Sequence, residues 1–339
     1  MGWHPVSLVA GGSRAMRSIV PGAALLAIAA GLGGAPSQTQ AQTFPARPVR
    51  IVVGFGAGGG TDIAARVIAQ RLSESFGSNF IVDNRPGASG NLAGDLVARA
   101  PADGHTMLMA NSTIAIPSLI AKPLFDIRKD FLPLSLVALG PSVLVVHPSL
   151  PVKDLKGLIA LARAKPGELS FGSGGIGNIT HLAMELMIAQ SGVRLVHVPY
   201  KGGAPSVVGL VSGEVATLFT AIPTALPMIK AGKMRAIAVS ISKRNPALPE
   251  VPTMAEAGLP DYYAASWYGL LLPAGVPRPV VDALAREISG AMQTPAVRDS
   301  MIRQGFDPVG NSPEEFAGFI REELVRWEKV VRAAGIKPE

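Results

Sequence analysis

The chain has 339 residues, a net charge of +7 at pH 7, 48% hydrophobic residues and no cysteine. Without cysteine it forms neither a disulfide nor a lipid-modified cysteine anchor. Its lysines and arginines are spread along the chain instead of forming a run, which argues against a nucleic-acid-binding surface. A chain of this length exceeds what one hydrophobic core usually serves, so two lobes are expected.

The N-terminal segment has the parts of a secretory signal. Two arginines precede an apolar stretch, residues 19–32, which is shorter than the roughly 20 residues of a membrane-spanning helix. Residues 39–41 (TQA) carry small side chains where a signal peptidase reads them. We therefore expect residues 1–41 to be a signal peptide that is cleaved near Ala41. The mature protein is expected to be periplasmic and to work as a monomer.

After this segment, short β-branched runs alternate with helical periodicity, which is typical of α/β layers around a largely parallel sheet. Residues 49–53 (VRIVV) predict a buried strand, residues 54–60 (GFGAGGG) a loop, and residues 61–76 a helix with its apolar residues on one face. We expect Thr61 or Asp62 to cap this helix.

The same alternation continues to the C-terminus. Further strands are expected at residues 80–82, 106–110, 143–146, 169–172, 195–199, 215–219, 234–240 and 266–272. Further helices are expected through 96–100 and at 154–164, 180–190, 279–292, 297–304 and 312–334, the last opened by a capping box of Ser312 and Glu315.

The strands fall into two series, which we assign to two lobes. Lobe 1 comprises residues 42–144 and 266–339, and lobe 2 comprises residues 145–265. Two crossovers between lobes imply a hinge with a ligand cleft between them.

Glycine-rich loops precede two of the expected helices. Residues 54–60 lie in lobe 1, and residues 171–178 (FGSGGIGN) lie in lobe 2. Bare backbone N–H groups at a helix N-terminus hold an anion, and a carboxylate suits them as well as a phosphate. Two such loops indicate a ligand with two carboxylates, or with one carboxylate and another polar end. Residues 200–203 (YKGG) would add a third wall.

Two enzyme interpretations remain as alternatives. Residues 54–59 match the dinucleotide motif G-x-G-x-x-G, and Asp83 ends the next expected strand; export argues against such a cofactor, and we expect none. Ser173 with His181 would serve an exported hydrolase or lyase, although no G-x-S-x-G elbow is present. His181 and Glu185 have the spacing of two metal ligands on a helix, but a helix-stabilising pair is favoured, and we expect no metal.

Several stretches, in order along the chain, resemble one family: the Bug-type (TctC-like) substrate-binding proteins of tripartite tricarboxylate transport systems. They include FPARPVRIVVGFGAGGGTDIAARVIAQRL, DNRPGASG, ADGHTMLMAN, VHVPYKGGAPSVVGLVSGEV and VPTMAEAG. The resemblance implies a type II-like periplasmic binding protein fold whose two α/β lobes close on a carboxylated solute. It also implies a protein without enzymatic activity, with the membrane subunits of a transporter as partners.

The resemblance also implies the ligand-binding positions, which are Phe55, Gly56, Ala57, Gly58, Gly59, Thr61, Asp62, Asn84, Ser112, Ser173, Gly174, Gly175, Asn178, Tyr200 and Thr220. Family members often carry aspartates in the stretch where this chain has Ala216 and Thr220. If an acid at position 220 pairs with a ligand ammonium in relatives, its absence here argues against an amino acid. We therefore expect a di- or tricarboxylate, or an aromatic carboxylate.

Overall fold

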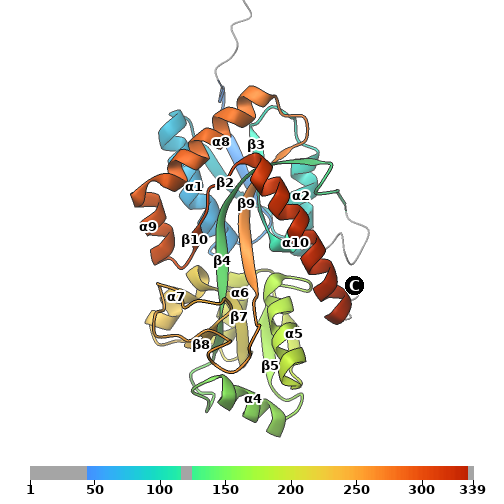
Figure 1. The fold of residues 1–339 in the computed structure, drawn as a ribbon, viewed down its shortest axis with the longest axis vertical. Helices are drawn as coiled ribbons and strands as arrows, with labels where there is room; N and C mark the ends of the chain where they lie inside the picture. The colour runs from blue at the N-terminus through green and yellow to red at the C-terminus, as the bar shows by residue number, and fades with distance from the viewer. Residues whose placement is uncertain (1–43, 116–123, 335–339) are drawn as a thin grey trace, which may run out of the picture. The chain divides into compact units, whose positions relative to one another are not determined.

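The computed structural model of the protein describes residues 44–115 and 124–334 (Figure 1). The predicted signal peptide, residues 1–41, lies outside the described residues. Within them, no helix combines the length and the apolar character that crossing a membrane requires.

The described residues form a mixed sheet of ten strands flanked by helices (Figure 1). The strands are β1 (Val49–Val53), β2 (Phe80–Asn84), β3 (Thr106–Asn111), β4 (Phe131–Val146), β5 (Ser170–Ser173), β6 (Val196–Pro199), β7 (Thr217–Ala221), β8 (Arg235–Val239), β9 (Ala265–Pro273) and β10 (Asp307–Pro308). The helices are α1 (Gly60–Phe76), α2 (Asn91–Ala98), α4 (Leu155–Ala164), α5 (Ile179–Ser191), α6 (Gly203–Val211), α7 (Ile222–Lys230), α8 (Arg278–Gln293), α9 (Pro295–Arg303) and α10 (Pro313–Ala334), with 3-10 turns η1 (Ala88–Gly90) and η2 (Ser112–Ala115).

The predicted strands and helices are all present, most of them within two residues of their expected bounds. Three elements were not predicted: β10, α6 and α7. Strand β4 is also much longer than expected, because it begins at Phe131 and not near residue 143.

Strands β4 and β9 run antiparallel through the middle of the sheet (Figure 1). From Phe131 to Pro141, β4 pairs with β9, and from Ser142 to Val146 it pairs with β7 and β8. The outer strands are parallel, β1 with β2 and β3, and β5 with β6 and β7. The expectation of a largely parallel sheet is therefore right for two sets of three strands, β1 to β3 and β5 to β7. It is wrong for the centre, where β4 and β9 carry the chain in opposite directions.

Buried apolar side chains gather at both ends of β4 and β9. In the first group, α1 and α8 pack on one face of the sheet and α2 and α10 on the other. In the second group, α4 and α5 pack on one face and α6 and α7 on the other. Along β4, the boundary between the two groups of buried side chains lies between Ala138 and Val143. At the start of β9, it lies between Ala264 and Trp267. This division lies close to the predicted lobe limits, which stay a prediction.

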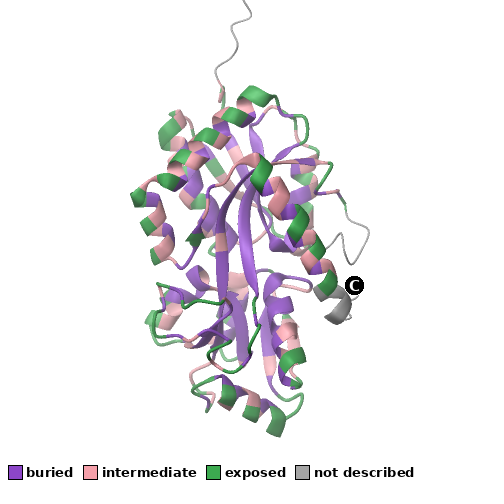
Figure 2. Ribbon diagram, viewed as in Figure 1, coloured by how far each residue is buried: buried purple, intermediate pink, exposed green. Residues whose placement is uncertain are grey.

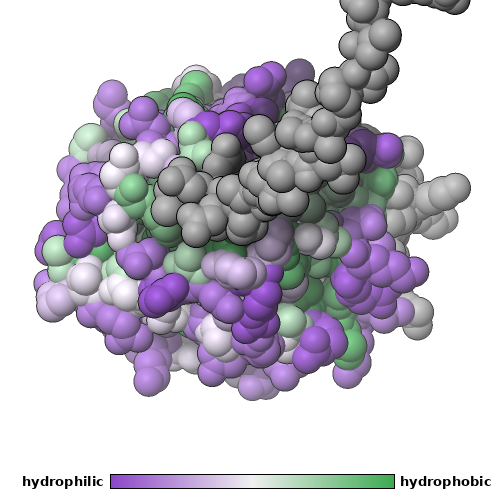
Figure 3. Space-filling model, turned by 90° about the horizontal axis from the view of Figure 1, so that it is seen from above, coloured by the Kyte–Doolittle hydropathy of each residue, from purple (hydrophilic) through white to green (hydrophobic). Residues whose placement is uncertain are grey.

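Burial follows the same layers. Both central strands are buried along nearly their whole length, whereas the outward faces of the helices are exposed (Figure 2). On the face seen in Figure 3, the visible side chains are mostly hydrophilic, with hydrophobic ones in small groups between them. This is the pattern of a surface that faces water.

The helix starts differ in how they are capped. Helix α1 follows Gly59, which has an extended backbone and no side-chain cap, so the expectation that Thr61 or Asp62 caps it is wrong. In contrast, α10 has the predicted capping box: Ser312 N–H donates to Glu315 Oε2 at 2.8 Å, and Glu315 N–H donates to Ser312 Oγ at 3.2 Å. Bare glycine in place of a cap leaves the start of α1 open to another partner.

Candidate functional site

A cleft of about 440 Å³, counted out to its opening, lies where four helices begin. It is lined by residues 59–61 at the start of α1, residues 178–180 at the start of α5, Gly203 of α6, and Ala221 and Thr224 of α7. The remaining lining residues come from the first loop and the strands, and they are Phe55, Asn111, Ser142, Thr220, Ser266 and Tyr268.

No charged side chain lines the cleft, since none of its lining residues is an acid, a lysine, an arginine or a histidine. The first N–H groups of each helix have no acceptor within the helix, and the helix dipole places partial positive charge there. The cleft therefore offers neutral donors to a small anion.

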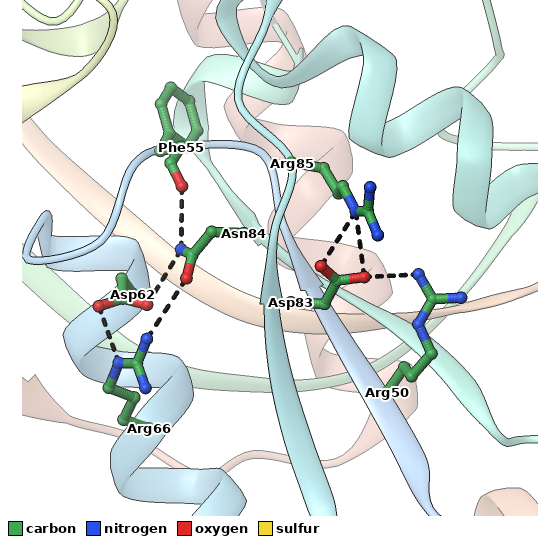
Figure 4. A network of polar contacts seen from close by, with 7 residues as sticks. All are labelled: Arg50, Phe55, Asp62, Arg66, Asp83, Asn84 and Arg85. Atoms are coloured by element: carbon green, nitrogen blue, oxygen red, sulfur yellow. Dashed lines mark hydrogen bonds and ion pairs between the residues drawn. The ribbon is translucent and has the colours of Figure 1, made fainter.

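The loop before α1 is held by the carboxylate of Asp62, which is almost fully buried (Figure 4). Asp62 Oδ2 accepts from Gly58 N–H and from Arg66 Nε, both at 2.9 Å, and Oδ1 accepts from Asn84 Nδ2 at 3.0 Å. The same Asn84 nitrogen donates to the Phe55 carbonyl at 3.0 Å. Burial raises the pKa of Asp62, but these donors, led by Arg66, outweigh it and hold the pKa below its ordinary value. The Asp62 carboxylate is thus ionised, and both of its oxygens already accept hydrogen bonds from the protein.

Asp83, on the neighbouring strand, forms a separate group (Figure 4). Its carboxylate accepts from Arg50 at 2.6 Å and from Arg85 at 3.0 Å. Burial raises the pKa of Asp83, but the two arginines lower it by more than burial raises it. The pKa of Asp83 is therefore below its ordinary value. The acid that a dinucleotide site would use for a ribose is therefore engaged by two guanidinium groups.

The second glycine loop is held by Ser173, which is fully buried. Its hydroxyl accepts from Gly175 N–H at 3.1 Å and lies 2.6 Å from His197 Nε2. His181 does not contact Ser173; its Nδ1 accepts from Gly177 N–H at 3.2 Å, and its ring stacks on His197 with centroids 4.0 Å apart. Burial and the neighbouring histidine lower the pKa of His197 to about 4. The Ser173/His181 pair of the hydrolase interpretation is therefore not formed.

The pair of His181 and Glu185 lies along one helix face, with 3.5 Å between His181 Nε2 and Glu185 Oε1. Across residues 44–115 and 124–334, no group of three or more acidic, histidine or cysteine side chains is placed to hold a metal ion. The pair therefore fits the helix-stabilising alternative.

The predicted ligand-binding residues fall into three sets. Those that line the cleft are Phe55, Gly59, Thr61, Asn178 and Thr220. Those that line a neighbouring pocket, which Phe55 also borders, are Gly174, Gly175 and Tyr200. Those that line neither are Gly56, Ala57, Gly58, Asp62, Asn84, Ser112 and Ser173. Ser112 instead supports the wall, since its hydroxyl lies 3.0 Å from that of Ser266.

The cleft also contains residues that the prediction missed, namely Asn111, Ser142, Ile179, Thr180, Ala221, Thr224, Ser266 and Tyr268. Asn111 could have been found, because it directly follows the strand predicted at residues 106–110 and precedes Ser112. Its Nδ2 donates to Thr61 Oγ1 at 2.9 Å and joins the end of β3 to the start of α1.

The two glycine loops are also linked through η1. Ser89 Oγ donates to the Ile176 carbonyl at 3.1 Å, which joins the turn after β2 to the loop before α5. Ala88 and Ser89 have φ angles of 45° and 51°, a left-handed conformation that non-glycine residues rarely adopt. Such strain persists only where the surroundings enforce it, and it is frequent at ligand-binding sites.

Two groups of βα units, joined by antiparallel strands and with helix starts around one cleft, define a periplasmic binding protein fold. The chain belongs to the TctC family, the tripartite tricarboxylate transporter family receptors, whose family model matches residues 64–336. It is accordingly a solute receptor of a family of transport proteins and not an enzyme, which confirms the function predicted from the sequence.

Relatives match over nearly their full length. The chain is 38% identical to protein BugT of Bordetella pertussis, over 93% of this chain and 97% of that protein. The structure of R. palustris Rpa4515 with adipate is 38% identical, with a TM-score of 0.85, and covers 87% of this chain and 100% of that one. MatC (Rpa3494) from Rhodopseudomonas palustris, with bound malate, is 33% identical, with a TM-score of 0.80, over 85% and 100%.

Proposed function

We propose that the protein is exported, loses residues 1–41, and captures a dicarboxylate in the periplasm for the membrane subunits of a tripartite tricarboxylate transporter. The observation that carries this proposal is the cleft itself, where four helix N-termini meet and no charged side chain lines the wall. A ligand with two negative ends suits several separate sets of N–H donors better than a ligand with one. The adipate and malate bound by two relatives support the same ligand class.

The cleft lacks what an amino acid needs. A ligand ammonium needs acceptors, and no lining side chain is a carboxylate. The side-chain oxygens of the two lining asparagines are already used: Asn178 Oδ1 accepts from Thr180 N–H at 3.0 Å, and Asn111 Oδ1 accepts from Thr113 N–H at 3.0 Å. An ammonium in this cleft would find neutral oxygens but no carboxylate to balance its charge, which favours a dicarboxylate over aspartate or glutamate.

Capture proceeds by closure of two lobes, which we assign to residues 42–144 with 266–339 and to residues 145–265. The two crossovers meet at Ser240, which is fully buried. Its N–H donates to the Ser142 carbonyl and its hydroxyl accepts from Ser142 N–H, both at 2.9 Å, while its carbonyl accepts from Ala264 N–H at 2.9 Å. These bonds support a hinge at Ser142, Ser240 and Ala264, with the Ser89 contact as part of the closed state.

The test is a binding panel on protein exported with its own N-terminal segment and purified from the periplasm. Mass spectrometry of the N-terminus checks cleavage near Ala41. Thermal shift and calorimetry then compare adipate, malate, citrate and phthalate with hexanoate, aspartate, glutamate and NADH. A ligand at about 100 times its Kd adds about 2.7 kcal/mol to the free energy of unfolding.

We expect stabilisation by at least one dicarboxylate. Hexanoate is the matched control, because it has the carbon chain of adipate and only one carboxylate, and it should bind more weakly. Binding of aspartate or glutamate alone, or of NADH alone, would contradict the proposal.

A further inference from the structure

Two hydroxyl groups in the cleft have no hydrogen-bond partner among the described residues. They are Thr220 Oγ1 and Thr224 Oγ1, and both oxygen atoms are buried. Thr220 as a whole is fully buried. A buried hydroxyl without a partner lowers stability, so folded proteins keep few of them, and one on a residue that lines a cleft is a candidate partner for a ligand.

Each hydroxyl lies near the start of a helix. Thr220 is in β7, and its Oγ1 lies 3.6 Å from the position that a Cβ on Gly203, at the start of α6, would occupy. Thr224 is in the first turn of α7, where Pro223 supplies no N–H group. The hydroxyl of Thr224 therefore adds a donor at a helix start that has lost one.

We propose that Thr220 and Thr224 form a subsite for one carboxylate of the ligand, with the two hydroxyls donating to its oxygens. This assignment rests on the proposed dicarboxylate function. The starts of α6 and α7 place partial positive charge beside the hydroxyls, which favours a negative group over a neutral one. A ligand without a second carboxylate would leave both hydroxyls unpaired, and that loss discriminates between ligands more strongly than lost apolar contact does.

The chain contains its own control for this inference. Thr113 is fully buried, and its hydroxyl also lacks a partner among the described residues, but it does not line the cleft. Valine has nearly the shape of threonine without the hydroxyl, so Thr113→Val removes the same group from a place the ligand does not reach.

The experiment measures the Kd of adipate and malate by calorimetry for the wild type and for T220V, T224V, T220S, T224S and T113V. We expect each cleft valine variant to weaken the dicarboxylate that the wild type binds by about tenfold or more. The serine variants keep the hydroxyl and should stay within about threefold of the wild type, as should T113V. The melting temperature of the ligand-free cleft variants should not fall, because no internal hydrogen bond is lost.

The outcomes separate the two proposals. If the wild type binds a dicarboxylate and the valine variants bind it equally well, the subsite is wrong and the proposed function stands. Equal losses in the valine and serine variants would also refute the subsite, because packing would then be the cause. If the wild type binds no carboxylate of the panel, both proposals fail.

Discussion

Replacing Asp62 by asparagine tests how the loop before α1 is held. The change keeps the shape of the side chain but removes its charge and one acceptor oxygen. Asp62 is 2% exposed and accepts from Gly58, Arg66 and Asn84, so one of these donors must lose its partner or accept a weaker one. The Arg66 side chain is 54% exposed, so its charge returns to water and is not stranded.

A hydrogen bond to a charged group contributes about 1.5–3 kcal/mol, and D62N loses the equivalent of about one. We therefore expect the free energy of unfolding to fall by about 2 kcal/mol at pH 7. Unfolding entropy of about 2 cal/mol/K per residue converts this loss to about 3 °C in Tm. Dicarboxylate affinity should fall several-fold as well, because the loop beside the cleft is no longer fixed.

The pH dependence gives the sharper test. The folded-state pKa of Asp62 is below its unfolded value, so the unfolded chain binds more protons as pH falls. Its stabilisation is complete above the unfolded pKa of about 4 and is lost as pH falls through the folded value. Urea unfolding from pH 7 down to pH 3 should therefore show the difference between wild type and D62N narrowing below about pH 4.

The matched control for this substitution is Asp83→Asn. Asp83 is also held by arginines, but its side chain is 21% exposed and those of Arg50 and Arg85 are 41% and 58% exposed. Ion pairs that are open to water contribute about 0–1 kcal/mol, so D83N should cost less than D62N. Equal stability of D62N and wild type at pH 7, or a difference that does not change with pH, would refute the reasoning.

Three other changes test the rest of the site. Gly60→Ala would place a Cβ against the Tyr268 hydroxyl, so we expect a loss of about 1–3 kcal/mol in stability by urea unfolding, together with weaker dicarboxylate binding in calorimetry. Ser89→Ala removes the hydrogen bond to Ile176, and stopped-flow measurements should show ligand release about 2- to 10-fold faster. Burial lowers the pKa of His197 to about 4, so the unfolded chain binds more protons than the folded chain between about pH 6.5 and 4. The free energy of unfolding should therefore fall by about 1–2 kcal/mol, after screening, as pH drops through that range. In His197→Gln this fall should be absent.

The fold was predictable where the sequence pattern is local. The first βα unit has a pure β-branched strand and a periodic helix, and β1 and α1 match their expected bounds within one residue. The first half of β4 was not predicted, and it contains Pro133, Gly140 and Pro141, residues that weaken a local strand pattern. Pro133 lies where the register against β9 shifts, between Pro133 and Ser135. A pairing between segments more than a hundred residues apart cannot be inferred from a local pattern.

The site was predictable only in part, for a related reason. The glycine loops could be predicted, since a run of glycines before a helix is a local sequence signal. Helices α6 and α7 were not predicted, although Pro205 and Pro223 lie in their first turns, where proline is a helix-start signal. Because α7 was not predicted, Thr224 was not predicted as a site residue either. Ser266 and Tyr268 reach the cleft only because β9 returns between β3 and β4, which is a property of the topology.

An anion site without a cation follows from the free energy of burying charge. An arginine enclosed with the ligand would have to give up its hydration, which an ion pair does not always recover. Helix N–H groups are fixed and partly desolvated before the ligand arrives, so enclosing a carboxylate among them adds little further cost. These donors are divided between the proposed lobes, α1 in one and α5, α6 and α7 in the other. We propose that one carboxylate of the ligand lies against α1 and the other against the helix starts of lobe 2, so that binding of the ligand is linked to closure of the cleft.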